Sequence, residues 1–163
     1  MSLFTAACAA LVFVAPVIQT SSPATSVDAV KRRLVGTWKL AKYEIFDERG
    51  AARPGGFDAG RIMYGDSGEM TAHLMRTGGS TAAATTEATR AAAFQSYLGY
   101  FGPYTIDPSK QIVVHHVVGS SRPDWIGSEQ VRHFALSEDG NQLTLSLTSG
   151  ERITQTLTWD RIR

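Results

Sequence analysis

Apolar and polar residues alternate along most of the chain, in short stretches separated by turns that contain glycine, proline or aspartate. The alternation is clearest at residues 153–159, where Ile153, Leu157 and Trp159 would share the inner face of a strand and threonines the outer face. Stretches of this kind with close turn signals are typical of antiparallel strands. Because about eight of them occur, we predict an all-β fold, an antiparallel up-and-down barrel wide enough for side chains or one small ligand.

The periodicity changes once along the chain. Residues 86–98 are rich in alanine and contain neither glycine nor proline, and Phe94, Tyr97 and Leu98 follow helical spacing. A threonine at the start of this stretch can cap a helix, and Glu87 suits the positive end of its dipole. The pattern therefore predicts one α-helix inserted into the barrel.

The first strand is irregular. Trp38 and Leu40 fall on one face of it, whereas Tyr43 and Ile45 fall on the other. One extra residue in a strand exchanges its two faces, so we predict a bulge or bend near Ala41.

The composition is that of an ordinary globular protein. Of 163 residues, 43% are hydrophobic and 19% are charged, and the formal net charge is +1. A chain of this length suits one domain. Binding to nucleic acid or to an anionic membrane surface needs concentrated basic charge, so we expect neither partner.

The first 25 residues differ from the rest. Residues 3–17 are almost wholly apolar and are followed by small polar residues, a pattern typical of a secretory signal peptide and too short for a comfortable membrane span. No lysine or arginine precedes the apolar run. We expect cleavage near Ala24, a barrel domain at residues 33–163, no membrane span in the mature chain and a secreted or periplasmic protein. An uncleaved, cytoplasmic chain is the alternative.

The single cysteine, Cys8, lies inside the expected signal peptide. The mature chain would then carry no thiol, which excludes disulfides, zinc–thiolate sites and cysteine nucleophiles from it. We therefore expect the fold to depend on its hydrophobic core.

One strand combines apolar and charged residues on the same face. Between residues 129 and 136, alternation places Gln130, Arg132 and Phe134 together. A buried arginine is costly unless a partner or a ligand satisfies it, so this face predicts the polar end of a ligand cavity. The alternative is a face that opens to solvent at the mouth of the barrel.

The histidines offer candidate chemistry without fixing it. Adjacent strand residues point to opposite faces, and His116 shares the more apolar face, although either His115 or His116 can be the inward one. His73, from another strand, could meet one of them across the barrel. No histidine spacing requires a metal, so we predict neither a metal nor another cofactor.

Several blocks of sequence together resemble the lipocalin-like domain family of bacteria and fungi. The His-His-Val block, followed by Trp-Ile-Gly and Gln-Val-Arg, is the most specific of them. The resemblance implies a calycin-type barrel with an internal pocket and a small-molecule-binding role, and it names no catalytic residue. It makes the matching His116, Trp125, Gln130 and Arg132 candidates for the pocket. The blocks are residues 34–38, 60–64, 97–104, 115–117, 123–127 and 130–132.

These observations favour binding of a small, mostly apolar molecule with a polar or acidic end. Trp38 and Phe134 would contact its body, while Arg132 and Gln130 would fix its polar end. Tyr100 is a further candidate for the binding site. Trp125, in a loop, could cover the cavity mouth or simply plug it.

Two other functions stay open at this point. One is a cyclase or isomerase in which His116 or His73 acts as general acid or base and Arg132 stabilises an anion. The other is a structural or protein-binding barrel, for which a filled interior would be expected.

Overall fold

The computed structural model describes residues 26–78 and 85–163. The expected signal peptide and Cys8 lie outside the described residues. Within the described part of the chain, no helix is long and apolar enough to cross a membrane.

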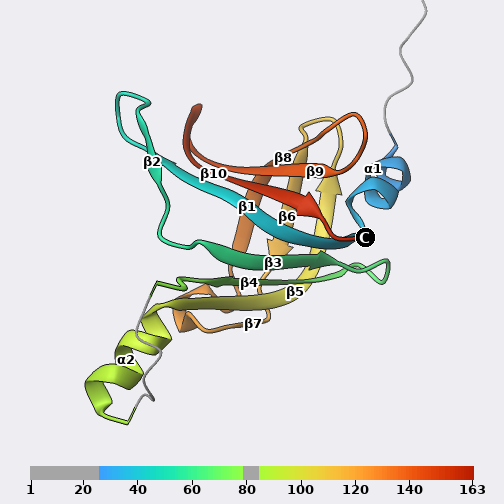
Figure 1. Ribbon diagram of the computed structural model, residues 1–163. Helices are drawn as coiled ribbons and strands as arrows, with labels where there is room; N and C mark the ends of the chain where they lie inside the picture. Colours follow the sequence, from blue (N-terminus) through green and yellow to red (C-terminus); the bar gives the residue numbers. More distant parts are fainter. Residues whose placement is uncertain (1–25, 79–84) are drawn as a thin grey trace, which may run out of the picture.

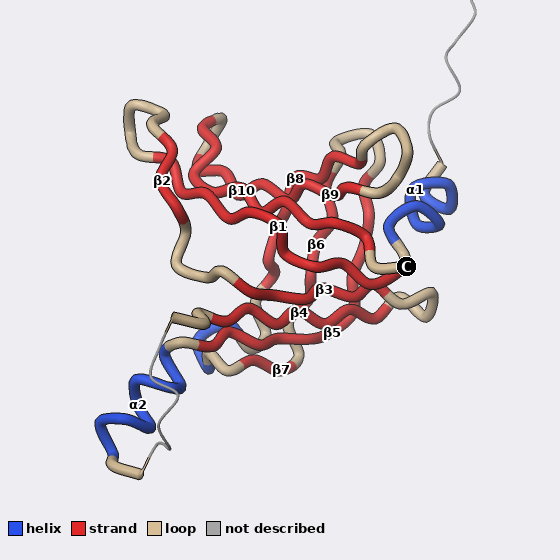
Figure 2. The backbone as a smooth tube through the Cα atoms, viewed as in Figure 1, coloured by secondary structure: helices blue, strands red, loops and turns tan. Residues whose placement is uncertain are grey.

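The strands form a closed, eight-stranded antiparallel barrel, which confirms the predicted fold (Figures 1 and 2). Each strand pairs with the next one around the barrel, and pairing of the last with the first closes it. Two short strands lie outside the ring: β2 (Ala52–Pro54) pairs with β1, and β7 (Gly119–Ser120) pairs with β5. The barrel strands are β1 (Gly36–Phe46), β3 (Ala59–Tyr64), β4 (Glu69–Met75), β5 (Tyr97–Asp107), β6 (Ile112–His116), β8 (Glu129–Leu136), β9 (Gln142–Ser149) and β10 (Arg152–Arg161).

A helix that the sequence pattern does not predict packs at one end of the barrel. This helix, α1 (Val27–Leu34), begins at Ser26, whose side chain accepts a hydrogen bond from the amide of Ala29 at 3.1 Å. Val30 and Leu34 are buried in the core, whereas the basic residues of the last turn remain largely accessible. Eight residues with two buried positions give too short a periodic signal to be read in advance.

The inserted helix exists but is shorter than predicted. Helix α2 (Glu87–Gln95) begins at Thr86, which caps it, and none of its residues is buried. Phe94 is 59% exposed, and Tyr97 and Leu98 belong to β5, where they pair with Met75 and Leu74 of β4. The expectation of an apolar helical face extending to residue 98 is therefore wrong, because pairing between the strands overrides the local period.

Two bulges set which side chains face the interior. The register of β1 against β10 shifts between Leu40 and Lys42, which confirms the bulge predicted near Ala41. A second shift, between Ile153 and Gln155 of β10, was not expected. It leaves Ile153 46% exposed, so the prediction that Ile153 shares the inner face with Trp159 is wrong.

Trp38 and Arg161 connect helix α1 to the start of β1 and the end of β10. The guanidinium of Arg161 lies 4.0 Å from the centre of the fully buried Trp38 ring. It donates hydrogen bonds to the carbonyls of Gly140 and Val35, and the Trp38 indole donates to the Leu34 carbonyl at 3.0 Å. These contacts hold together α1, the start of β1, the β8–β9 turn and the end of β10.

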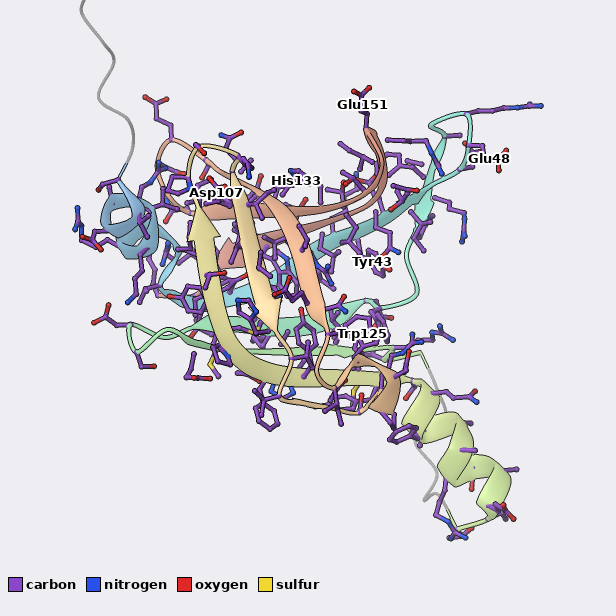
Figure 3. The ribbon with its side chains drawn as sticks, turned by 180° about the vertical axis from the view of Figure 1, so that it is seen from behind. Tyr43, Glu48, Asp107, Trp125, His133 and Glu151 are labelled. Atoms are coloured by element: carbon purple, nitrogen blue, oxygen red, sulfur yellow. The ribbon has the colours of Figure 1, made fainter. Side chains whose placement is uncertain are left out.

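Strand β5 curves strongly around the barrel (Figure 3). It pairs with β7 before Gly102 and with β6 from Tyr104 onward. At Gly102 the carbonyl oxygen of His116 would lie 2.0 Å from an added Cβ, so only glycine allows this approach. Next to this curve, Tyr100 of β5 and His115 of β6 lie within hydrogen-bond distance of one another on the inner side of the barrel.

We predict that Trp159→Ala lowers the free energy of unfolding by about 3–5 kcal/mol, because it truncates a buried aromatic side chain of β10. Trp159 is 1% exposed. The matched control is Ile153→Ala on the same strand, which should change stability by about 0.5 kcal/mol or less. Urea unfolding measures both, and equal effects would contradict the bulge in β10.

Candidate functional site

The barrel interior contains a cavity of about 180 Å³. Two of its lining residues, Tyr43 and Trp125, lie toward the end of the barrel opposite α1 (Figure 3). Both are only partly buried, so we take this end as the mouth of the cavity. Aromatic pairs line the mouth: Tyr43 stacks on Phe57, and Trp125 packs edge-on against Tyr100. Most of the remaining wall is aliphatic. The complete lining is Tyr43, Phe57, Ile62, Ala72, Leu74, Leu98, Tyr100, Arg122, Trp125, Arg132, Leu145, Leu147, Gln155, Leu157 and Trp159.

Arg132 is the charged group buried in this cavity. It is 7% exposed and comes from the inner face of β8, as the alternation of that strand predicted. Its guanidinium donates to the Val131 carbonyl at 2.8 Å and to Oε1 of Gln130 at 3.3 Å. Among the described residues no ion pair includes Arg132. Since a guanidinium has five N–H donors, donors remain for a bound acceptor.

The phenols near Arg132 stay protonated at neutral pH. Burial raises the pKa of Tyr100 above its usual value of about 10, and the positive charge of Arg132 and a hydrogen bond from its guanidinium offset only part of that rise. The pKa of Tyr43 is raised for the same reason, against the charges of Arg132 and Arg53. Tyr43 donates its hydroxyl hydrogen to Oε1 of Gln155 at 2.7 Å. The cavity therefore combines one buried positive charge with neutral phenols.

The inward histidine is His115. It is 1% exposed and lies between two tyrosines, with Nε2 2.8 Å from Tyr64 Oη and Nδ1 3.0 Å from Tyr100 Oη. Burial holds its pKa well below the usual value, and the charges of Arg132 and His116 lower it further. The imidazole is therefore neutral at physiological pH.

The two histidines proposed as acid or base face away from the cavity. His116 bonds to Thr105 at 3.0 Å on the outer wall and lies 3.3 Å from a carboxylate oxygen of Glu129. His73 is exposed on the outer face of β4, beside Tyr97. The expectation that His116 or His73 lies in the pocket is corrected, because β6 pairs with β8 in the register that turns His115 inward.

The structure separates the other predicted site residues into two groups. Arg132, Tyr100 and Trp125 line the cavity, and Gln130 orients Arg132 from beside it. Trp38 and Phe134 are buried elsewhere in the core and are not part of the lining.

Several lining residues are not predicted by the sequence pattern, among them Phe57, Tyr43, Gln155 and Arg122. Tyr43 and Gln155 follow the two bulges in their strands, so simple alternation could not place them reliably. Phe57 lies between β2 and β3, and no periodic signal marks it.

Comparison with known proteins identifies the family. The family model for the lipocalin-like domain matches residues 35–162. The chain belongs to the lipocalin-like domain family. No curated protein matches this lipocalin-like chain. One solved structure that matches it is a redesigned β-barrel, with 13% identity over 82% of this chain and 95% of the other and a TM-score of 0.43. At that level the match carries no argument about function.

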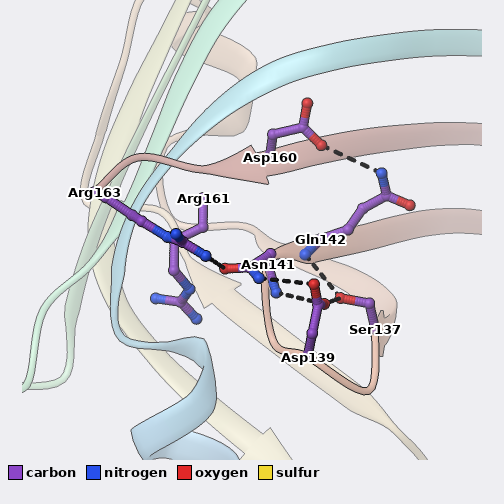
Figure 4. A pocket seen from close by; sticks show the side chains of 7 residues that line it. All are labelled: Ser137, Asp139, Asn141, Gln142, Asp160, Arg161 and Arg163. Carbon is purple, nitrogen blue, oxygen red and sulfur yellow. Dashed lines mark hydrogen bonds between the residues drawn. The ribbon is translucent and has the colours of Figure 1, made fainter.

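A second hollow of the lipocalin-like domain lies at the end that α1 covers, and it is a polar surface depression (Figure 4). Its side chains mainly bond to one another: Asp139 accepts hydrogen bonds from Ser137 and Asn141, which lower the pKa of its carboxyl to about 2. Gln142 bonds to Asp160 in the same way. Because its polar groups already have partners, we place the candidate site in the barrel cavity. In the described part of the chain, no group of three histidine, cysteine, aspartate or glutamate side chains could hold a metal.

We predict that the stability of this lipocalin-like domain falls as the pH is lowered from 7 to 5, because the pKa of His115 is lower in the folded than in the unfolded state. Below the unfolded value of about 6.5 the unfolded chain binds one more proton, so stability is lost at up to about 1.4 kcal/mol per pH unit. The loss continues as the pH falls toward the folded pKa.

Urea unfolding at several pH values measures this slope. His115→Gln should flatten it, whereas His116→Gln, on the outer wall, should leave the contribution of His115 intact. Equal slopes for the parent and His115→Gln would contradict the assignment.

Proposed function

We propose that this chain binds a small, mostly apolar molecule that carries one carboxylate or carbonyl group. The observation that carries the proposal is Arg132, a guanidinium that is 7% exposed inside an apolar cavity and has no ion-pair partner among the described residues. A buried charge without a partner is costly, and an acidic ligand would compensate for it. Family membership agrees with ligand binding in general terms.

The cavity volume limits the size of the ligand. An apolar cavity of about 150 Å³ holds a benzene molecule, whereas pockets for drug-sized ligands measure about 300–1,000 Å³. At about 180 Å³, this cavity suits a single ring or a short branched chain with one polar group. It is too small to enclose a long-chain fatty acid.

The two ends of such a ligand would meet different surfaces. Leu74, Leu145 and Leu157 form part of the aliphatic wall and would bury its body. Arg132 would contact the polar end, and a guanidinium fork matches the geometry of a carboxylate. The aromatic pairs at the mouth would exclude water from the bound molecule.

The alternative functions receive less support. Neither a carboxylate nor a histidine occurs among the described lining residues, and the candidate histidines His73 and His116 lie on the outer wall. A proton-transfer enzyme needs a base within reach of its substrate, and the tyrosines of the lining stay protonated because burial raises their pKa values. A purely structural barrel would not need a charged group in a cavity.

We further propose that the chain acts outside the cytoplasm. The apolar run at residues 3–17 motivates this proposal, and cleavage near Ala24 would leave the Ser26 cap of α1 in place. N-terminal sequencing of the protein from the cell envelope or medium should begin between residues 20 and 28. An intact Met1 on cytosolic protein would contradict it.

For the binding site, we predict that Arg132→Met weakens the affinity for benzoate by about 1.5–3 kcal/mol, the scale of a lost hydrogen bond to a charged group. This equals a rise in Kd of roughly 10- to 150-fold. Methionine retains much of the aliphatic volume, so the ligand-free variant should be as stable as the parent or slightly more stable. Isothermal titration calorimetry and urea unfolding measure the two quantities.

Toluene serves as the matched neutral probe, because it fills the same space without a carboxylate. Its affinity should change little in Arg132→Met. Equal losses for benzoate and toluene, or no binding of benzoate by the parent protein, would overturn the proposed function.

A further inference from the structure

A row of three buried side chains adjoins the cavity and is not explained by the proposed function. Tyr64, His115 and Tyr100 come from β3, β6 and β5, and the imidazole lies between the two hydroxyl groups. All three are at most 5% exposed. Tyr100 lines the cavity, whereas Tyr64 and His115 do not. The row therefore connects the sealed core with the binding site.

Counting hydrogens shows that the row has one donor in excess. Each phenol carries one O–H, and a neutral imidazole carries one N–H and one acceptor nitrogen. Two hydrogen bonds join the three groups, at 2.8 Å and 3.0 Å. Two bonds use two hydrogens, so the third belongs to whichever tyrosine does not donate to His115.

The burial of the two tyrosines decides which of them keeps the extra hydrogen. Tyr64 is 2% exposed, and His115 is the partner of its hydroxyl within the described residues. If Tyr64 accepted from His115, its own hydrogen would be buried without an acceptor, which is costly. Tyr100 instead faces a cavity of about 180 Å³, which has room for water or a ligand to accept its hydrogen. Tyr64 thus donates to Nε2, and Nδ1–H donates to Tyr100.

We propose that Tyr100 is a second ligand-anchoring residue, which Tyr64 and His115 hold as a hydrogen-bond donor directed into the cavity. This inference rests on the proposed function and narrows its ligand class. The Arg132 guanidinium also lies within hydrogen-bond reach of the Tyr100 oxygen, which lowers the pKa of Tyr100. Because arginine can only donate, the hydrogen of Tyr100 stays available to a ligand, as do the remaining hydrogens of Arg132. The group they contact must be an acceptor, a carboxylate or ketone oxygen, and an ammonium group is rejected. Tyr64 and His115 are positioning residues, because neither contacts the ligand.

The tautomer of His115 tests the direction of the row without any ligand. Nitrogen-15 NMR of histidine-labelled protein should show the proton on Nδ1 of His115. Tyr64→Phe removes the donor to Nε2 and should change the nitrogen shifts of His115. A proton on Nε2 in the parent protein would overturn the inference.

Benzoate titration tests the consequence for binding. Tyr100→Phe should raise the Kd for benzoate about tenfold, and Tyr64→Phe should raise it several-fold although Tyr64 does not reach the ligand. The matched control is Tyr104→Phe. Tyr104 packs edge-on against Tyr64, and its hydroxyl donates to the Gly65 carbonyl, outside the row and outside the cavity lining. This variant should leave the Kd within twofold of the parent.

The outcomes separate the two proposals. If benzoate binding depends on Arg132 but Tyr64→Phe and Tyr100→Phe behave like Tyr104→Phe, the present inference fails and the proposed function stands. If the parent protein does not bind benzoate, both fail. A raised Kd in Tyr64→Phe and Tyr100→Phe, with His115 protonated on Nδ1, supports the proposal that Tyr64 and His115 hold Tyr100 as a donor to the ligand.

Discussion

Closure of the barrel by the pairing of β1 with β10 is the constraint on which the site depends. The pairing joins Leu40 to Trp159 and Tyr43 to Leu157, across the two ends of the chain. It removes the free edges of the sheet, and the interior becomes a region from which water is largely excluded. Arg161, above Trp38 and bonded to carbonyls near α1 and the β8–β9 turn, secures that closure at one end.

Inside the enclosed barrel, each charged or polar group strongly affects the protonation of its neighbours. In a surface groove, Arg132 would be screened by water, but beside buried phenols its charge affects the protonation of Tyr100 and His115. The hydrogen bonds of Arg132 to Val131 and Gln130 hold it in place without neutralising it. The site thus combines the positive charge of Arg132 and hydrogen-bond donors with an apolar wall. This is the usual arrangement for recognition of a small molecule with one polar end.

The same arrangement accounts for the neutral state of His115. A protonated imidazole would add a second buried positive charge near Arg132 and would place an N–H opposite each tyrosine hydroxyl. Desolvation and charge repulsion both oppose that state. His115 therefore serves as a fixed donor–acceptor pair between Tyr64 and Tyr100, whereas His116, one residue later, contacts Thr105 and Glu129 on the outer wall.

The sequence by itself determined the barrel, the bulge near Ala41 and the inner face of β8 that carries Arg132, because alternation of apolar and polar residues reports which face of a strand is buried. The tertiary structure decided the rest. The choice between His115 and His116 depends on the register of β6 against β8, and a shift of one residue exchanges the faces. The bulge beside Gln155, the entry of Phe57 from a loop and the end of α2 at Gln95 arise from contacts between distant segments. Local patterns do not contain such contacts, and for that reason the composition of the cavity could be read only from the folded chain.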